Sequence, residues 1–291
     1  MAKEYRVCEH WFSRLYTGDQ FMRHLTPGER GLRGVWARGA RLLNRAHPGL
    51  RLDPARVAPA AVSWVSDALR RYSPAPPAIQ VTHEEVLFPA RPDTDRFAAI
   101  ERRPDPEPRV LFAGRIEEQK GPEVAVRALA ALERDHGIAA RLAVAGDGPA
   151  DESAALDRLA RELGVADRVE RLGRLGGDAL AGEVSRAHVW LVPSVWEEPA
   201  PTTCVEAALA RVPVVAARVG GIPEMLDGGA YGLLFERADA GDCARALAAT
   251  LRDADATARR VGEARERADG LRYAPYLAHM DRFLERSLAA A

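Results

Sequence analysis

Cysteine and lysine are both scarce in this sequence of 291 residues. The three cysteines, Cys8, Cys204 and Cys243, show neither the spacing of a zinc site nor the pattern of a disulfide framework. Lys3 and Lys120 are the two lysines of a chain whose other basic residues are arginines. The wealth of arginine and alanine is typical of a GC-rich coding sequence, so each lysine is a residue that the composition does not favour.

Long apolar runs and a strong net charge are also missing. No stretch is long enough to span a bilayer, and the N-terminus does not have the pattern of a signal peptide. The 41 basic and 42 acidic residues leave a formal net charge of −1, which provides no global field for nucleic acid or a membrane surface. We therefore expect a cytoplasmic protein with one large or two ordinary domains and no nucleic-acid partner.

The first part of the chain, residues 1–103, has the less regular pattern. Arg33–Ala46 has the periodicity of a basic amphipathic helix; such a helix can bind a membrane surface or nucleic acid but more often presents a solvated face, and we interpret it as structural. Ala61–Ser66 is typical of a short strand and Asp67–Tyr72 of a helix, which a proline-rich turn ends. Ile79–Leu87 is a second candidate strand.

From Arg109 onward, apolar runs alternate with helical patterns. A charged, proline-rich segment at 101–109 is interpreted as the linker before them. The predicted strands are Val110–Ala113, Arg141–Ala145, Arg168–Leu172, Val189–Val192, Val212–Ala216 and Tyr231–Phe235. Helices separate them, the longest running from Pro122 to Asp135. This alternation predicts a parallel, doubly wound α/β sheet that binds its ligand at the carboxyl ends of the strands.

The loop after the fourth predicted strand holds two carboxylates, Glu197 and Glu198. Thr202 or Thr203 is expected to cap the helix that follows, and Glu206 lies within the first turns of this helix. Glutamates near a helix start are often only surface charges that the helix dipole favours. This stretch alone therefore leaves a surface role and a binding role equally open.

A second candidate loop follows the first predicted strand. Gly114 allows a sharp turn there, and Arg115 and Lys120 flank the start of the helix at Gly121–Pro122. Two cations beside free backbone N–H groups at one end of a sheet would bind a pyrophosphate. The alternative is that both cations pair with the neighbouring glutamates at the surface, as is common in charged loops.

Glycine-rich turns follow three further strands. Gly146–Pro149 is sufficiently explained as a tight turn, and Gly173 stands directly after the third predicted strand. Gly220–Pro223 precedes Glu224, which we interpret as a residue that orders its loop rather than as a catalyst. Each of these turns could occur by chance, whereas their order along the chain is informative.

Taken in order, these motifs resemble those of retaining GT-B glycosyltransferases of the glycogen-synthase-like type (family 4, "glycosyl transferases group 1"). The run P-S-V-W-E-E-P-A-P-T-T-C-V-E-A at 193–207 is similar to the family's E-x7-E motif. It departs from that motif at Ala200 and Pro201, where the family has Phe-Gly. The departure affects function, because the family holds the sugar with backbone N–H groups at this point and proline supplies none. Gly114–Gly121 is similar to the family's G-R…K-G motif at every fixed position.

The resemblance implies a GT-B-like α/β fold. It predicts an incomplete α/β acceptor-side domain at 1–103, a complete Rossmann-like domain that binds the nucleotide sugar at 109–270, and a C-terminal helix at 271–291 that returns towards the N-terminal half. The implied function is transfer of a sugar from a nucleoside-diphosphate sugar to an unknown acceptor, with retention of anomeric configuration. Because cations of the chain would hold the diphosphate, no metal or other cofactor is expected.

The resemblance also assigns a donor site residue by residue. Arg115 and Lys120 would neutralise the leaving diphosphate and, with Glu198 at the transferred sugar, are the expected catalytic residues. Glu206 would accept hydrogen bonds from the donor ribose. The other expected donor contacts are Gly114, Gly173 beside the nucleobase, Thr202 and Thr203.

The part before 103 is shorter than the family's acceptor domain. Nothing before Ala61 resembles the family's opening strand and glycine-rich loop, and 88–97 retains little of the family's segment there. The chain is accordingly expected to be a fragment, a subunit that a partner chain completes, or a divergent relative. The alternative to a transferase is a non-catalytic or partner-dependent interaction module that retains donor binding. No motif supports His10 or His83 as an acceptor-side histidine.

Overall fold

The computed structural model describes residues 60–72 and 81–289, and its contacts divide the chain into two compact units. One unit comprises 1–60, 73–82 and 291, and the other comprises 61–72 and 83–290. The second unit contains nearly all of the described residues. The helix predicted at 33–46 and His10 lie outside them.

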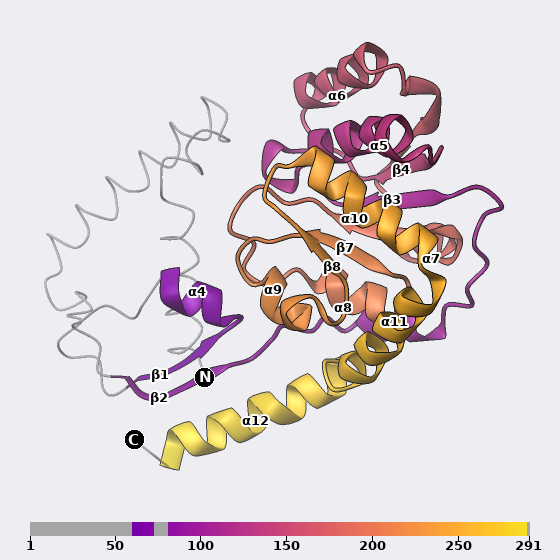
Figure 1. The fold of residues 1–291 in the computed structure, drawn as a ribbon. Helices are drawn as coiled ribbons and strands as arrows, with labels where there is room; N and C mark the ends of the chain where they lie inside the picture. Colours follow the sequence, from indigo (N-terminus) through magenta and orange to yellow (C-terminus); the bar gives the residue numbers. More distant parts are fainter. Residues whose placement is uncertain (1–59, 73–80, 290–291) are drawn as a thin grey trace, which may run out of the picture. The chain divides into compact units, whose positions relative to one another are not determined.

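Six parallel strands form the sheet at the centre of the second unit (Figure 1). They are β3 (Arg109–Ala113), β4 (Arg141–Ala145), β5 (Val169–Gly173), β6 (Val189–Val192), β7 (Val214–Ala217) and β8 (Leu233–Phe235). Strands β6 and β7 are buried throughout, which is why their sequences are continuous apolar runs without polar alternation. The predicted doubly wound parallel sheet is confirmed.

The strand order is β5-β4-β3-β6-β7-β8, and every neighbouring pair is parallel. The chain moves outward from β3 to β5, crosses back over the sheet and continues outward on the other side from β6 to β8. The order therefore reverses between β3 and β6, which pair directly. In doubly wound sheets, ligands bind outside the carboxyl ends of the strands at this switch point.

Helices cover both faces of this sheet. On one face α5 (Pro122–His136) contacts α6 (Ala150–Glu162) and α10 (Ala240–Arg252); on the other, α8 (Thr202–Leu209) contacts α11 (Ala254–Asp269) and the 3-10 helix η3 (Thr94–Ala99). The remaining elements of this unit beyond residue 100 are η4 (Glu118–Lys120), η5 (Ala166–Arg168), α7 (Gly177–Arg186), α9 (Ile222–Met225), η6 (Asp227–Gly229) and α12 (Tyr273–Ala289). Phe97 of η3 is buried against Trp190 of β6, with 6.0 Å between ring centroids, so η3 takes a place in the helical layer.

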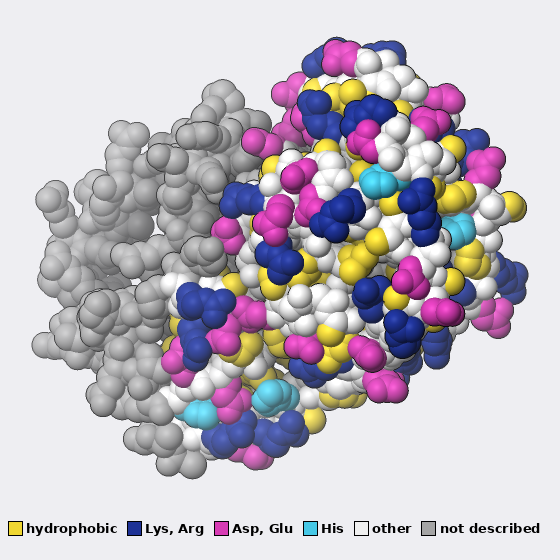
Figure 2. Space-filling view, in the orientation of Figure 1, with side chains coloured by type: hydrophobic (Ala, Val, Ile, Leu, Met, Phe, Trp, Pro, Cys, Tyr) yellow, Lys and Arg dark blue, Asp and Glu magenta, His cyan; other side chains and the backbone are white. Residues whose placement is uncertain are grey.

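Acidic and basic side chains are interspersed on the face of the described residues that Figure 2 presents. No helix of the described residues combines the length and the apolar character needed to cross a membrane.

The segment before the large sheet contains a strand–serine–helix unit, as predicted. Strand β1 (Ala60–Trp64) leads through Ser66 into α4 (Asp67–Tyr72), and β2 (Val81–Val86) pairs with β1. The carboxylate of Glu85 in β2 forms an ion pair with the guanidinium of Arg286 in α12 at 2.6 Å and lies 3.2 Å from Nε2 of His279. The C-terminal helix thus contacts β2, while the domain boundaries expected at 103, 109 and 270 remain predictions.

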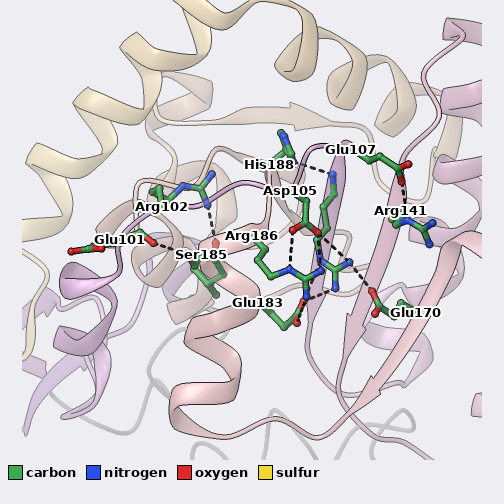
Figure 3. Close-up of polar contacts among 12 residues, drawn as sticks. Glu101, Arg102, Asp105, Glu107, Arg141, Glu170, Glu183, Ser185, Arg186 and His188 are labelled. Atoms are coloured by element: carbon green, nitrogen blue, oxygen red, sulfur yellow. Dashed lines mark hydrogen bonds and ion pairs between the residues drawn. The ribbon is translucent and has the colours of Figure 1, made fainter.

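The segment 101–109, interpreted as the linker, lies against the end of α7 (Figure 3). The Arg102 guanidinium and the backbone N–H groups of Arg103 and Asp105 donate to the last three carbonyls of α7, those of 184–186, at 2.8 to 3.1 Å. These carbonyls have no partner within the helix, so the linker satisfies them.

Arg109, the first residue of β3, is the centre of an ion cluster at the amino ends of the strands. Its side chain is only 1% exposed and pairs with Glu170 at 2.6 Å, Glu183 at 2.5 Å and Asp105 at 3.8 Å. Arg186 binds Asp105 through two bonds of 2.9 Å and Glu183 at 3.0 Å. We call these five residues the amino-end cluster. Its two guanidiniums meet three carboxylates, so it fixes the linker to β3, β5 and α7.

His188 joins this cluster through the backbone. Its Nδ1 accepts a hydrogen bond from the backbone N–H of Arg109 at 3.1 Å, which requires that Nδ1 carry no proton and that the ring be neutral. Burial, and then the positive charge of Arg102, lower the pKa of His188, and the negative charge of Asp105 opposes them. The bond from Arg186 lowers the pKa of Asp105.

Candidate functional site

A second ion cluster lies at the carboxyl ends of the strands, where the strand order reverses. Both carboxylate oxygens of Glu198, in the loop after β6, lie 2.8 Å from Nζ of Lys120, in the loop after β3. Glu198 Oε2 also accepts bonds from the Ser194 hydroxyl at 3.0 Å and from Trp196 Nε1 at 2.7 Å. We call these four residues the switch-point cluster. The structure thus brings together two residues that the sequence assigned to separate motifs.

Lys120 is held from two sides. Besides Glu198 it faces the ring of Trp196, with Nζ 5.5 Å from the centroid, a cation–π arrangement. The side chain of Lys120 is 23% exposed and that of Glu198 is 8% exposed. The pair is therefore largely out of water, yet the lysine remains reachable by an anion. A diphosphate at this position would share the ammonium group with Glu198.

Arg115 is placed differently from Lys120. It pairs with Glu117 at 2.7 Å, and its side chain is 56% exposed. The alternative interpretation, surface pairing with neighbouring glutamates, thus describes Arg115 but not Lys120. An exposed ion pair contributes little stability, so Arg115 can exchange Glu117 for another anion at small energetic cost.

Backbone hydrogen bonds link the loops along this edge of the sheet. Bonds of 2.7 to 2.9 Å connect the end of β5 with the loops after β4, β3, β6 and β7 in turn. The N–H to carbonyl pairs are Gly146 to Gly173, Ile116 to Asp147, Val195 to Gln119 and Gly221 to Glu198. The predicted donor glycine Gly173 thereby lies in the same continuous edge as Lys120 and Glu198.

Gly121 shows why the G-R…K-G motif must end in glycine. Its φ is 67°, in the left-handed region, and a Cβ there would lie 1.9 Å from the carbonyl oxygen of Pro193. The loops after β3 and β6 are therefore in direct backbone contact at this point. Any larger residue would push Lys120 away from Glu198.

The start of α8 differs from the prediction. Neither Thr202 nor Thr203 is the N-cap, because the helix begins at Thr202 and Pro201 takes the cap position without a side-chain bond. Pro201 has φ −72° and ψ 114°, an extended conformation that suits the residue before a helix. The hydroxyl of Thr202 bonds instead to Glu206 one turn later. Thr203 is half-buried beside it.

Glu206 is a buried carboxylate, 8% exposed. Burial raises its pKa, while the Thr202 bond and the charges of Arg91 and Arg96 lower it and Asp93 raises it. Arg91 and Asp93 directly precede η3 and Arg96 lies within it, a segment that the sequence did not mark as part of a site. The sequence contains only a weak signal for this contact, because these residues come near α8 only when η3 packs in the helical layer.

Cys204 and His83, two further residues with reactive side chains, have structural roles. Cys204 lies between the two glutamates of the E-x7-E run and is fully buried, and burial, followed by the charges of Glu198 and Glu206, raises its thiol pKa to about 12. A thiol with that pKa is inert as a nucleophile. His83 contacts Glu85 and the ring of Phe283, away from the residues assigned to the donor. Among the described residues, no group of three His, Cys, Asp or Glu side chains could hold a metal ion.

Comparison with known proteins identifies the family of this chain. Residues 93–267 match the family model described as "Glycosyl transferases group 1". The D-inositol 3-phosphate glycosyltransferase of Nocardia farcinica is 40% identical over 161 residues, 54% of this chain and 35% of that protein. The enzyme of the same name from Streptomyces griseus is 35% identical over 216 residues, 71% of this chain and 44% of that protein. The chain thus spans less than half of the length of these relatives.

Solved structures share the architecture. HepE of Anabaena, solved in complex with UDP, has a TM-score of 0.66 at 20% identity. The match covers 78% of this chain and 64% of the HepE chain. Sucrose-phosphate synthase of Thermosynechococcus elongatus has a TM-score of 0.65 at 25% identity and covers 79% of this chain and 59% of its own. The GT-B-like fold expected from the sequence is confirmed. By its matched residues and its fold, this chain belongs to the glycosyl transferases group 1 family.

Proposed function

We propose that this chain binds a nucleoside-diphosphate sugar at the carboxyl edge of its sheet and serves glycosyl transfer with retention of configuration. The observation that carries the proposal is the Lys120–Glu198 pair at the switch point, which places a reachable cation beside a buried carboxylate. A cation that stabilises a leaving diphosphate, next to a polar group for the sugar, is what transfer from such a donor requires.

Each predicted site residue has a role in this proposal. Lys120 and Arg115 neutralise the charge that develops on the leaving diphosphate, so a divalent metal is not needed for that purpose. Glu198 orients the transferred sugar, and Glu206 accepts hydrogen bonds from the ribose hydroxyls. Gly114, Gly173, Thr202 and Thr203 complete the donor contacts. The lowered access of water at Glu198 and Glu206 strengthens their hydrogen bonds to a ligand.

The names of the similar proteins suggest which substrates to test first. UDP is present in the HepE structure, so uridine nucleotides are the first donors to test, followed by GDP, ADP and dTDP compounds. Several relatives are named D-inositol 3-phosphate glycosyltransferase, so D-inositol 3-phosphate is the first acceptor to test. We keep both as substrate proposals for this chain.

Pro201 favours a second candidate, a module that binds the donor without efficient transfer. Proline has no N–H to offer the sugar beside Glu198, where the family uses such a donor.

Acceptor positioning is a second reason for weak transfer. Correct positioning of donor and acceptor can lower a reaction barrier by roughly 7–11 kcal/mol, so weak acceptor positioning would abolish transfer and leave donor binding intact. A partner chain that supplies acceptor contacts would restore it. For the isolated chain we expect donor binding with weak or absent transfer.

Calorimetric titration with UDP-, GDP-, ADP- and dTDP-sugars tests donor binding. We expect one nucleotide class to bind wild type and to bind Lys120→Met poorly, with Arg127→Met on the exposed face of α5 as the control. A nucleotide-release assay with and without D-inositol 3-phosphate then separates the two candidates, and NMR of the product gives its anomeric configuration. If no compound of the panel binds wild type, the proposal is wrong.

A further inference from the structure

Glu224 makes a contact that its place in a glycine-rich loop did not predict. This residue of α9 accepts the backbone N–H of Asp67 at 2.7 Å and that of Ala68 at 2.6 Å, one on each carboxylate oxygen. Both N–H groups belong to the first turn of α4, more than 150 residues earlier in the chain. Arg71 of α4 lies 3.4 Å from the same carboxylate. Glu224 therefore caps a helix of a distant segment.

The rest of the first turn of α4 is satisfied locally. The Ser66 hydroxyl accepts the N–H of Leu69 at 3.1 Å, as an N-cap serine does, and the Ser66 carbonyl accepts the N–H of Arg70 at 3.1 Å. The N–H groups of the first two helical residues have no partner within a helix. Glu224 supplies both acceptors, and its negative charge also suits the helix dipole. Without it, α4 would lose its connection to the loop after β7.

The same loop contacts the donor side. The N–H of Gly221 donates to the carbonyl of Glu198 at 2.7 Å, three residues before Glu224. A Cβ on Gly221 would lie 2.1 Å from the carbonyl oxygen of Pro199 and 2.8 Å from Cβ of Ser66. The short segment 221–224 is thus in contact with the Glu198 loop on one side and with Ser66 and α4 on the other.

A cavity of about 490 Å³ adjoins this contact. Asp67 and Glu224 line one part of it, and Phe88, Leu271 and Tyr276 line another. The space lies beside one side of the start of α4, while Ser66 and Ala68 are themselves buried. The bonds to Glu224 add to this packing, and the adjacent space leaves room for the helix to shift when these bonds break.

We propose that Glu224 is a positioning residue that couples the donor loop around Glu198 to the position of α4. This inference rests on the proposed function and on the expectation from the sequence that the segment before 103 is the acceptor-side domain. A nucleotide sugar held at Glu198 fixes the loop 197–201, this loop holds Gly221, and Glu224 transmits the restraint to α4. Glu224 itself touches neither donor nor acceptor. Its effect is that donor occupancy further stabilises the anchored position of α4.

Coupling of this kind must be reciprocal. If a bound nucleotide strengthens the anchoring of α4 by some factor, the anchored α4 strengthens nucleotide binding by the same factor. Loss of the anchor should then weaken nucleotide binding by that factor. A carboxylate that only stabilises the fold would change the exchange of α4 equally with and without nucleotide.

Hydrogen exchange of peptides covering 61–72, followed by mass spectrometry, tests both parts. The variants are Glu224→Ala, Glu224→Gln, which keeps one acceptor and loses the charge, and the control Glu263→Gln on the exposed face of α11. In unliganded protein, we expect exchange in these peptides to be about tenfold faster in Glu224→Ala than in wild type, with Glu224→Gln between them and the control unchanged.

The same measurement is then repeated with the nucleotide sugar that binds in the titration, starting with the UDP-sugars. We expect the nucleotide to slow exchange at 61–72 in wild type but not in Glu224→Ala, and the slowing factor to equal the factor by which Glu224→Ala weakens nucleotide binding. Equal slowing in both proteins, or none in wild type, overturns the coupling. If no nucleotide binds wild type, the proposed function and the coupling both fail, whereas the unliganded comparison still decides whether Glu224 anchors α4.

Discussion

The two ion clusters at opposite ends of one sheet are built from similar groups but are open to solvent to different degrees. In the amino-end cluster, Arg109 is 1% exposed and meets three carboxylates. In the switch-point cluster, Lys120 is 23% exposed and meets one carboxylate, and the neighbouring Arg115 is more than half exposed. The first cluster has protein partners for all its charge, while the second leaves cationic capacity for a ligand.

This difference separates structural from functional charge within one domain. A buried guanidinium with several carboxylates cannot release any of them cheaply, so it fixes its segments, here the linker, β3, β5 and α7. A partly open lysine with a single carboxylate can share its charge with an incoming anion. Burial and partner number, rather than residue type, therefore indicate which cluster serves a ligand. The comparison predicts that removing a cation from the amino-end cluster lowers the stability of the fold. Removing a cation from the switch-point cluster should instead lower the affinity for the ligand.

The largest effect is expected from Arg109→Met, which leaves three carboxylates without their common partner. Breaking a buried ion pair by removing one member typically costs about 3–5 kcal/mol. Urea unfolding should show a loss of this size. Arg141→Met is the matched control, because Arg141 lies opposite Arg109 in the strand register but forms only an exposed pair with Glu107. If both variants are equally stable, the amino-end cluster is not the structural anchor that its burial indicates.

The next largest effect is expected at the other end of the sheet and on affinity. A charge-assisted hydrogen bond contributes ~1.5–3 kcal/mol, and for the partly buried Lys120 we expect the upper part of that range, about 100-fold in Kd for the nucleoside diphosphate. Calorimetric titration of Lys120→Met measures it, and circular dichroism checks the fold. Unchanged affinity in a folded variant would contradict the assignment of the switch-point cluster to the ligand.

A smaller loss of affinity is expected from Arg115→Gln. Arg115 is exposed and paired with Glu117, so its bond to a diphosphate is screened and replaces an existing contact. We expect the lower part of the same range, about tenfold in Kd, and a weaker dependence of Kd on salt than in wild type. Titrations at two salt concentrations test this. A loss as large as that of Lys120→Met would show that exposure does not rank the two cations.

The smallest effect concerns His188 beside the amino-end cluster. Because burial lowers its pKa, the unfolded chain binds a proton in a range where the folded protein does not. The stability that the neutral His188 ring contributes is fully present above the ordinary histidine pKa of about 6.5. It is lost as the pH falls through the lowered pKa of the folded protein. We expect less than about 1 kcal/mol, since the ring is partly exposed.

Urea midpoints of wild type, His188→Gln and the control His136→Gln, measured above and below neutral pH, test this sign. His188→Gln should flatten the fall of stability on the acidic side, while His136→Gln should leave it as in wild type. A steeper fall in His188→Gln would mean that the neutral ring is not the form that the fold selects.

The fold could be predicted from the sequence because its signals are local. A short apolar run such as Val189–Val192, ended by Pro193, favours a buried strand, and Gly121–Pro122 indicates a helix start. The two donor motifs are also local patterns, one in the loop after β3 and the other running from the loop after β6 into α8, and their donor role remains a prediction.

What the sequence could not show are partners that only tertiary structure brings together. Nothing in the local sequence connects Lys120 with Glu198, Arg109 with Glu170, or Glu224 with α4, because an ion pair has no sequence pattern of its own. Pro201 at the N-cap was also missed, since two threonines beside it are the stronger capping residues by propensity. Local rules fail where a loop has to fit its neighbours.

The backbone contacts between the loops of the carboxyl edge restrict how this site can evolve. The backbone of Gly121 lies against that of Pro193, and the backbone of Gly221 lies against that of Pro199, with no side chain between these segments. Hydrogen bonds also join the segments along this edge. An insertion or a bulky replacement in one loop would displace the others together. New donor preferences must therefore arise by exchange of outward-pointing side chains on a nearly fixed backbone, so relatives with different substrates should share this edge and differ in what it carries.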